Sequence, residues 1–258
     1  MSEFAADRHA ITRALEAIAD ALRAPPLRLH VAASAPVGDT HATRLIVSRP
    51  GARVQIETTP VMRGTVHPVR VMTVSQRVEI TFGFARMQVL DFADLYAGKL
   101  AAALSRQHPR DWFDVGLLLD SGRLDEHLWR TFLVYLVASP KPAAEILAPG
   151  EPADFATSFR TQFEGMTENP VTPDQLLAVR ERFLALRATL LDRAACEFLL
   201  AMEREAPDFD LIGLPASAQL PGVRRKLQNM ARRSAAKREA DYRQLMTTLE
   251  RIAAATST

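Results

Sequence analysis

The hydrophobic pattern changes its period near residue 90, and this change sets the fold class of the chain. Before it, short segments rich in β-branched residues follow one amphipathic helix, which we expect over residues 5–23. After it, apolar residues recur every three or four positions, the spacing of amphipathic helices. The sequence therefore predicts an α+β protein, with a mixed sheet in residues 1–90 and a helical domain in residues 91–258.

Local signals place the individual elements. The Pro50-Gly51 pair suits a type II turn and predicts a hairpin. Asp91 is a suitable N-cap, and Pro109 suits the first turn of the next helix. Thr172 opens a capping box, from which we expect one long helix to about residue 205. The expected strands are residues 27–33, 43–48, 53–58, 69–74, 78–82 and 85–90, and the other expected helices are residues 125–138 and a basic helix from residue 223.

Composition excludes several classes of protein. Hydrophobic residues make up 48% of the chain and its net charge is +2, so the chain can bury a core and is not intrinsically disordered. Its single cysteine, Cys196, excludes an intrachain disulfide and a multi-cysteine zinc site. The sequence shows neither a signal peptide nor the ~20 consecutive apolar residues of a membrane span. We therefore expect a cytoplasmic protein with no membrane partner.

The common nucleotide-binding and nucleophile motifs are missing, but one segment concentrates charge. No G-x-x-x-x-G-K-[ST], G-x-G-x-x-G or G-x-S-x-G sequence occurs, and the histidines show no metal-ligand spacing. Lys99 and Arg106 are two helical turns apart and share a face. Asp111 and Asp114 share a face of the following helix, with Arg110 beside them. Three cations and two carboxylates are thus predicted to meet across a short connection.

These charged residues have more than one interpretation. The cations suit a polyphosphate, with carboxylates that orient them or hold a metal ion, but the same charges also suit a solvated salt-bridge network at a helix–helix corner. Glu57, on the polar side of a strand, can bind a metal or simply face solvent. The basic helix can bind phosphates, as in RNA, or keep the protein in solution. Its cations are Arg224, Arg225, Lys226, Arg232, Arg233, Lys237, Arg238 and Arg243.

The segment from Lys99 to Asp114 resembles the C-terminal motif of the AbiEii/AbiGii nucleotidyltransferase toxin family. There, a K-x-x-A helix is followed by an arginine and then by R-D-x-x-D. The corresponding residues here are Lys99-Leu100-Ala101-Ala102, Arg106 and Arg110-Asp111-Trp112-Phe113-Asp114. Residues 56–57 and 61–66 look like the family's strand and following loop, and residues 163–167 and 219–229 resemble one AbiEii-like subgroup. The resemblance covers nearly the whole chain.

This resemblance implies a DNA polymerase β-like nucleotidyltransferase fold followed by a helical domain. It implies a toxin that transfers a nucleoside monophosphate from an NTP to an acceptor such as tRNA, that has a cognate antitoxin, and that acts in abortive phage infection. By position, Lys99 looks like a triphosphate ligand, and Asp111 and Asp114 look like the later acids of the family. Arg106 and Arg110 would support the phosphates or those acids.

One family motif is missing from the sequence. The family opens with a glycine turn followed by D-x-D. The two carboxylates of D-x-D hold two Mg²⁺ ions together with a third carboxylate, and Glu57 resembles this third carboxylate. The only D-x-D here is Asp208-Phe209-Asp210, far from that place. Residues 5–23 resemble the helix that follows D-x-D, which implies truncation or, alternatively, a decayed relative. The 258 residues are then expected to bind at most one metal ion and turn over little, or to act as a non-catalytic NTP- or RNA-binding module.

Overall fold

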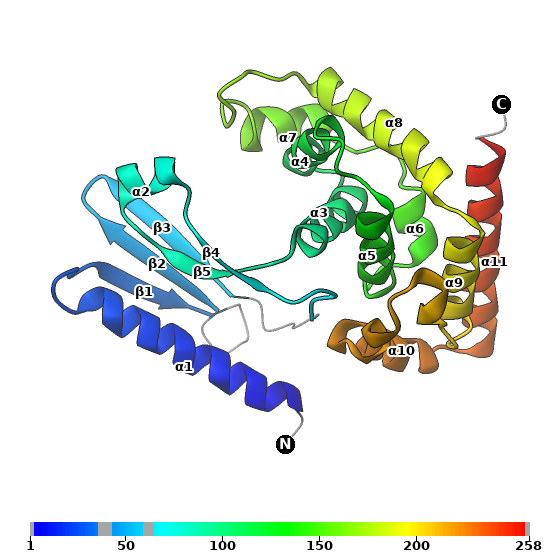
Figure 1. Cartoon of the computed structure of the whole chain (residues 1–258), viewed down its shortest axis with the longest axis horizontal. Coiled ribbons are helices and arrows are strands. Elements are labelled where there is room, and N and C mark those ends of the chain that lie inside the picture. The colour runs from blue at the N-terminus through cyan, green and yellow to red at the C-terminus, as the bar shows by residue number, and fades with distance from the viewer. Residues whose placement is uncertain (1–2, 36–42, 59–63, 256–258) are drawn as a thin grey trace. The chain divides into compact units, whose positions relative to one another are not determined.

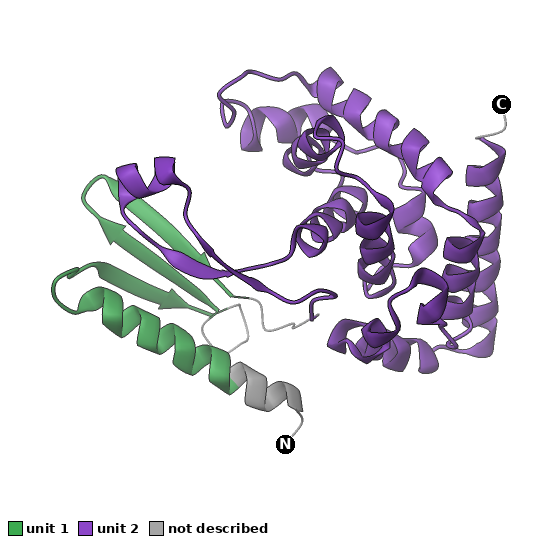
Figure 2. Ribbon diagram, viewed as in Figure 1, with its two compact units in different colours: residues 1–62 green, residues 63–258 purple. Residues whose placement is uncertain are grey.

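The structure is a computed structural model that describes residues 3–35, 43–58 and 64–255. The chain divides into two compact units, residues 1–62 and 63–258, which Figure 2 shows in different colours. Two small antiparallel sheets precede a long succession of helices (Figure 1), and this order confirms the predicted α+β class. The functional domain boundary near residue 90 stays a prediction.

The first unit packs one helix against a three-stranded sheet. Its elements are α1 (Glu3–Arg23), β1 (His30–Ser34), β2 (Arg44–Arg49) and β3 (Ala52–Glu57). The strands pair antiparallel in the order β1-β2-β3, and the predicted hairpin joins β2 to β3. Gly51 in its turn has a φ of +77°, a conformation that favours glycine. Leu15 of α1 is buried with Val31 and Leu45, so one face of the sheet lies against α1.

The second unit begins with a two-stranded ribbon that a short helix interrupts. Its elements are β4 (Arg70–Thr73), α2 (Gln76–Phe82) and β5 (Arg86–Val89). The strand predicted over residues 78–82 is wrong, because these residues lie in α2. Apolar residues alternate there as in a strand, but Ser75 caps a helix by accepting a hydrogen bond from Val78, and the chain leaves the helix at Gly83. The N-cap at Ser75 therefore favours a helix here, despite the strand-like alternation of apolar residues.

Nine helices and two 3-10 turns make up the rest of the described chain. They are α3 (Phe92–Arg106), α4 (Pro109–Asp120), α5 (Glu126–Val137), α6 (Ala143–Leu147), α7 (Phe155–Gln162), α8 (Pro173–Leu190), α9 (Arg193–Glu203), η1 (Phe209–Ile212), η2 (Pro215–Gln219), α10 (Pro221–Ala231) and α11 (Ala235–Ala254). Asp91 and Thr172 cap α3 and α8 as predicted. The long helix expected to residue 205 is instead two helices, because Asp192 caps α9. Ser234 likewise begins α11 within the predicted basic helix.

The core of the second unit extends through its helices, and its largest fully buried side chains lie on α3, α4, α5, α8 and α9. Trp112 and Trp129, the two tryptophans of the chain, are both buried in it. The ring of Trp112 lies 6.2 Å from that of Phe183, which fixes α4 against α8. None of the described helices combines the length and the apolar character needed to cross a membrane.

Two buried arginines on α8 differ in how their guanidinium groups are satisfied. Arg180 is 3% exposed, and it donates to Gln107 Oε1 at 2.8 Å and to the carbonyls of Pro149 and Gly150 at 3.1 and 2.9 Å. Arg187 is 8% exposed, and its Nε and Nη1 atoms have no hydrogen-bond partner in the described part of the chain. Burial, reinforced by two nearby arginines, lowers the pKa of Arg187 to about 10.

Candidate active site

Helices α3 and α4 bring four of the predicted residues together in two ion pairs. Lys99 Nζ lies 2.5 Å from Asp114 Oδ2, and these side chains are 33% and 28% exposed. Arg106 binds Asp111 through both carboxylate oxygens, with Nε to Oδ2 at 3.0 Å and Nη2 to Oδ1 at 2.7 Å. Such a bidentate pair fixes both side chains more firmly than a single contact does. The roles of these residues in binding or catalysis stay predictions.

The corner between α3 and α4 determines where Arg106 points. Gln107 ends α3 in the left-handed conformation, with φ 54° and ψ 33°. Its side-chain amide donates to the carbonyls of Ala103 and Leu104, while its Oε1 accepts from Arg180. This turn starts α4 at once, so that Asp111 lies in the first helical turn, where the helix dipole favours a carboxylate.

Two further predicted residues are outside these pairs. Arg110 is exposed on α4 and forms no ion pair with any described residue. Glu57 lies at the end of β3 in the first unit, where it is 53% exposed and 2.7 Å from Arg44 of the neighbouring strand. The structure thus places Glu57 in a solvated cross-strand ion pair, and its assignment as a metal ligand stays a prediction.

Sequence reasoning missed Asp94, which is completely buried beneath the loop that precedes the ribbon. Its Oδ1 accepts hydrogen bonds from the Val66 N–H at 2.7 Å and the Tyr135 hydroxyl at 2.9 Å, and its Oδ2 accepts from the His67 N–H at 2.9 Å. Three donors on one carboxylate hold this loop on α3 and α5. The available signal was a carboxylate on the apolar side of α3, three residues after the N-cap.

The same loop requires a glycine. Gly64 has a φ of +76°, and a Cβ atom at this position would lie 2.9 Å from Leu220 Cδ2 and 3.1 Å from Pro221 Cδ. The loop therefore lies directly against the junction of η2 and α10. Residues 61–63, which belong to the segment that resembles the family's loop, are outside the described residues.

The basic C-terminal segment is not a continuous face of free cations. Lys226 is buried, and its ammonium group donates to the carbonyls of Ser139 and Lys141 at 2.7 and 2.8 Å. Burial lowers the pKa of Lys226 to about 8. Four other cations form ion pairs: Arg233 and Lys237 with Asp241, Arg238 with Glu205, and Arg243 with Glu239. The segment therefore offers fewer cations to RNA than its sequence suggests.

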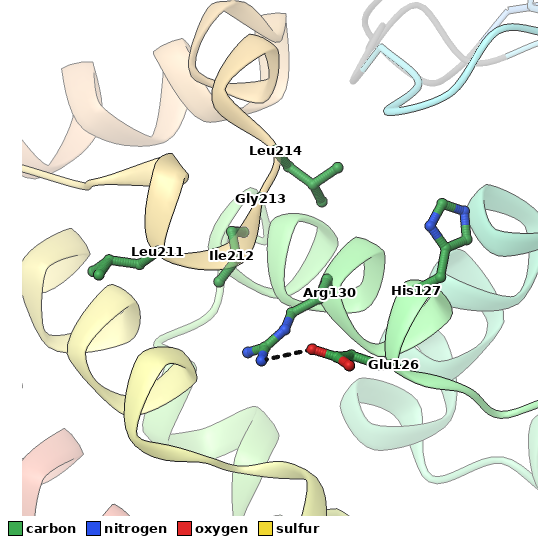
Figure 3. A pocket seen from close by; sticks show the side chains of 7 residues that line it. All are labelled: Glu126, His127, Arg130, Leu211, Ile212, Gly213 and Leu214. Atoms are coloured by element: carbon green, nitrogen blue, oxygen red, sulfur yellow. Dashed lines mark hydrogen bonds and ion pairs between the residues drawn. The ribbon is translucent and has the colours of Figure 1, made fainter.

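A pocket of about 400 Å³ lies between α5 and the loop after η1 (Figure 3). Figure 3 shows Arg130 directed toward Glu126, with His127 one position along the helix. Arg130 also pairs with Asp192, so its charge is compensated within the protein. No residue of the Lys99–Asp114 motif lines this pocket.

Comparison with known families defines the class of this protein. The sequence model described as nucleotidyl transferase AbiEii toxin, type IV toxin–antitoxin system, matches residues 2–229, which include both ion pairs of the α3–α4 corner. The class is therefore that of nucleotidyltransferase toxins. The chain belongs to the AbiEii family. Neither a curated protein nor a solved structure gives a significant match to it.

The described residues do not by themselves fit the metal centre of a nucleotidyltransferase. No three His, Cys, Asp or Glu side chains within residues 3–35, 43–58 and 64–255 converge on a point where a metal ion would lie. Asp111 and Asp114 are each held by a cation, as is Glu57. A Mg²⁺ ion would have to compete with these cations for the carboxylates.

Proposed function

We propose that this AbiEii family member transfers a nucleoside monophosphate from an NTP to a nucleic-acid acceptor such as tRNA. The acceptor hydroxyl attacks the α-phosphorus, the bond to the bridging oxygen breaks, and pyrophosphate leaves while the hydroxyl proton passes to solvent. Family membership supports the class of reaction. The observation that carries the site assignment is the doubly paired corner of Lys99–Asp114 and Arg106–Asp111.

The cations of this corner suit the triphosphate. Lys99 provides a flexible ammonium group, and Arg106 and Arg110 provide planar donors that match phosphate oxygens. Arg110 has no carboxylate partner among the described residues, so it is available without displacing one. Asp111 and Asp114 then act by orienting these cations or, once released from them, as acids of the site.

Glu57 remains the proposed carboxylate for Mg²⁺. The resemblance assigns it this role, and its exposed position at the end of β3 leaves one face of the carboxylate open to solvent. The cellular setting that we propose is the cytoplasm, with a cognate antitoxin that restrains the toxin and with phage infection as the occasion for its action.

Growth arrest and label transfer test the proposal together. The chain is expressed without its antitoxin, and transfer from α-labelled NTPs to tRNA is measured with the purified protein. Lys99→Ala and Asp111→Ala should abolish both arrest and labelling. Asp120→Ala is the control for loss of a carboxylate from α4, because Asp120 forms an exposed ion pair with Arg182 of α8 at 2.7 Å. Arrest that persists in Lys99→Ala and Asp111→Ala contradicts the site assignment.

A second function, binding without catalysis, is favoured by one observation. The first half of the sequence contains no D-x-D, and no described group of side chains forms a metal site. The chain would then bind NTP or RNA through Lys99, Arg106 and Arg110 and turn over little. NTP should raise the melting temperature by mass action, and Lys99→Ala should remove that increase. Robust monophosphate transfer by the 258-residue chain would exclude this second function.

A further inference from the structure

An arginine with no acidic partner among the described residues lies over an aromatic ring at the start of α3. The guanidinium carbon of Arg123, in the turn after α4, is 3.4 Å from the centroid of the Phe92 ring. The Phe92 ring lies 4.6 Å from that of Tyr96, at an interplanar angle of 45°. Arg123 is exposed, and it forms no ion pair with any described residue. The ring therefore binds the cation without neutralising its charge.

The two rings lie on the same side of α3 as Lys99. Phe92, Tyr96 and Lys99 follow one another at intervals of four and three residues, which places them along a single helical face. Both rings are partly buried against the core of the second unit, so that unit fixes their positions. The hydroxyl of Tyr96 makes no hydrogen bond to a described residue, which leaves it free to act as donor or acceptor.

We propose that Arg123, Phe92 and Tyr96 form a stacking platform for the base of the nucleoside triphosphate. This inference rests on the proposed function, because it assigns the base of the same NTP whose phosphates contact Lys99. A guanidinium plane and aromatic rings are the surfaces on which proteins stack bases, and such surfaces accept every base because each has a π-face. The platform would therefore strengthen NTP binding while distinguishing little among the four bases.

The helix geometry matches the size of one nucleotide. From the midpoint between Phe92 and Tyr96 to Lys99 the helix rises by about 7 Å, and from the same point to Arg106 it rises by about 18 Å. A base on the platform therefore lies one to two turns from Lys99, within the length of a single nucleotide. Arg106 lies about two further turns along the axis, where it binds Asp111 through both carboxylate oxygens.

A comparison of the affinities for NTPs and for inorganic triphosphate distinguishes contacts with the base from contacts with the phosphates. Affinities are measured by calorimetry for each of the four NTPs and for inorganic triphosphate, using the full chain. Arg123→Ala and Tyr96→Leu should weaken NTP binding about tenfold, the usual effect of losing one stacking partner, and should leave triphosphate affinity unchanged. Lys99→Ala should weaken both ligands. Tyr96→Phe, which keeps the ring, should bind NTPs nearly as tightly as the wild type.

Two controls separate stacking from charge. Arg123→Lys keeps the positive charge and loses the plane, so it should bind NTPs as weakly as Arg123→Ala. Arg232→Ala removes an exposed cation of the segment between α10 and α11 and should change neither affinity. If Lys99→Ala weakens NTP binding while Arg123→Ala and Tyr96→Leu do not, the platform is refuted and the proposed function stands. If no NTP binds, or if Lys99→Ala has no effect, both are refuted.

Discussion

Replacing Arg187 with methionine should stabilise the second unit, although deleting a buried side chain usually destabilises a protein. Two of the guanidinium nitrogens of Arg187 have no partner among the described residues, and the side chain is 8% exposed. Its pKa, lowered to about 10, means that the charged form is about 3 kcal/mol less favourable in the folded chain than in water. Methionine has a similar length and carries no charge, so Arg187→Met should raise the free energy of unfolding by about 1–3 kcal/mol.

Arg180 provides a matched control on the same helix. It is buried as deeply as Arg187, but its guanidinium donates to Gln107 and to two carbonyl oxygens. Arg180→Met would leave these acceptors without a donor, and it should therefore lower the free energy of unfolding by about 3–5 kcal/mol. The two substitutions remove the same charge from the same helix, but Arg180 also pairs with Glu181 and Glu151, so it differs from Arg187 in both its hydrogen bonds and its ion pairs.

Urea unfolding followed by tryptophan fluorescence measures both effects. Trp112 and Trp129 are the two tryptophans of the chain and both are buried in the second unit, so the signal reports the unfolding of that unit. An increase of 1 kcal/mol should also raise the melting temperature by about 2–4 °C. A decrease of more than about 1 kcal/mol in the free energy of unfolding of Arg187→Met would refute the reasoning. It would mean that the guanidinium of Arg187 has hydrogen-bond partners in the folded protein.

Three other substitutions test features of the same unit. Gly64→Ala should cost about 1–3 kcal/mol of thermal or urea stability, because the residue has a positive φ and its Cβ would clash with Leu220; an unchanged midpoint would contradict the described loop. Asp94→Asn should cost about 2–3 kcal/mol by the same assays, because an amide cannot accept from all three donors. The pKa of Lys226 is lowered to about 8 in the folded chain. Between this pH and the ordinary pKa of lysine, the side chain is therefore protonated in the unfolded chain and largely deprotonated in the folded chain. Stability should therefore rise by up to about 3 kcal/mol from pH 7.5 to 10 relative to Lys226→Met, and a flat difference between the two proteins would exclude this coupling.

Local sequence signals were sufficient to predict the corner that carries the candidate site. Asp91 and Pro109 fixed where α3 and α4 begin, and helical spacing then placed Lys99 and Arg106 toward the next helix. Sequence could not assign which cation pairs with which carboxylate, because the pairing depends on the left-handed turn at Gln107. In the structure, Lys99 pairs with Asp114 and Arg106 with Asp111. The functional roles of these residues stay predictions.

Features that depend on tertiary packing were beyond the sequence. Arg180 and Arg187 lie in a helix that the sequence predicts, but their burial depends on the neighbouring helices α4 and α7, which pack against α8. Lys226 likewise read as part of a cationic face, whereas its ammonium group is enclosed by carbonyl oxygens. The misassigned segment at residues 78–82 shows the opposite limit, since a short alternating pattern fits a strand equally well until a cap decides.

The Lys99–Asp114 pair gives the protein an internal competitor for anions. A phosphate that binds Lys99 has to compete with a carboxylate that already lies 2.5 Å from the ammonium group. A simple anion therefore gains only the difference between two similar pairings, and dissolved phosphate or random polyanions are poorly retained. Under the proposed function, a nucleoside triphosphate that also contacts neighbouring groups would meet this cost, and its arrival would release Asp114 beside the bound phosphates. The proposal thus implies that the free carboxylate of Asp114 would be present only when such a ligand is bound.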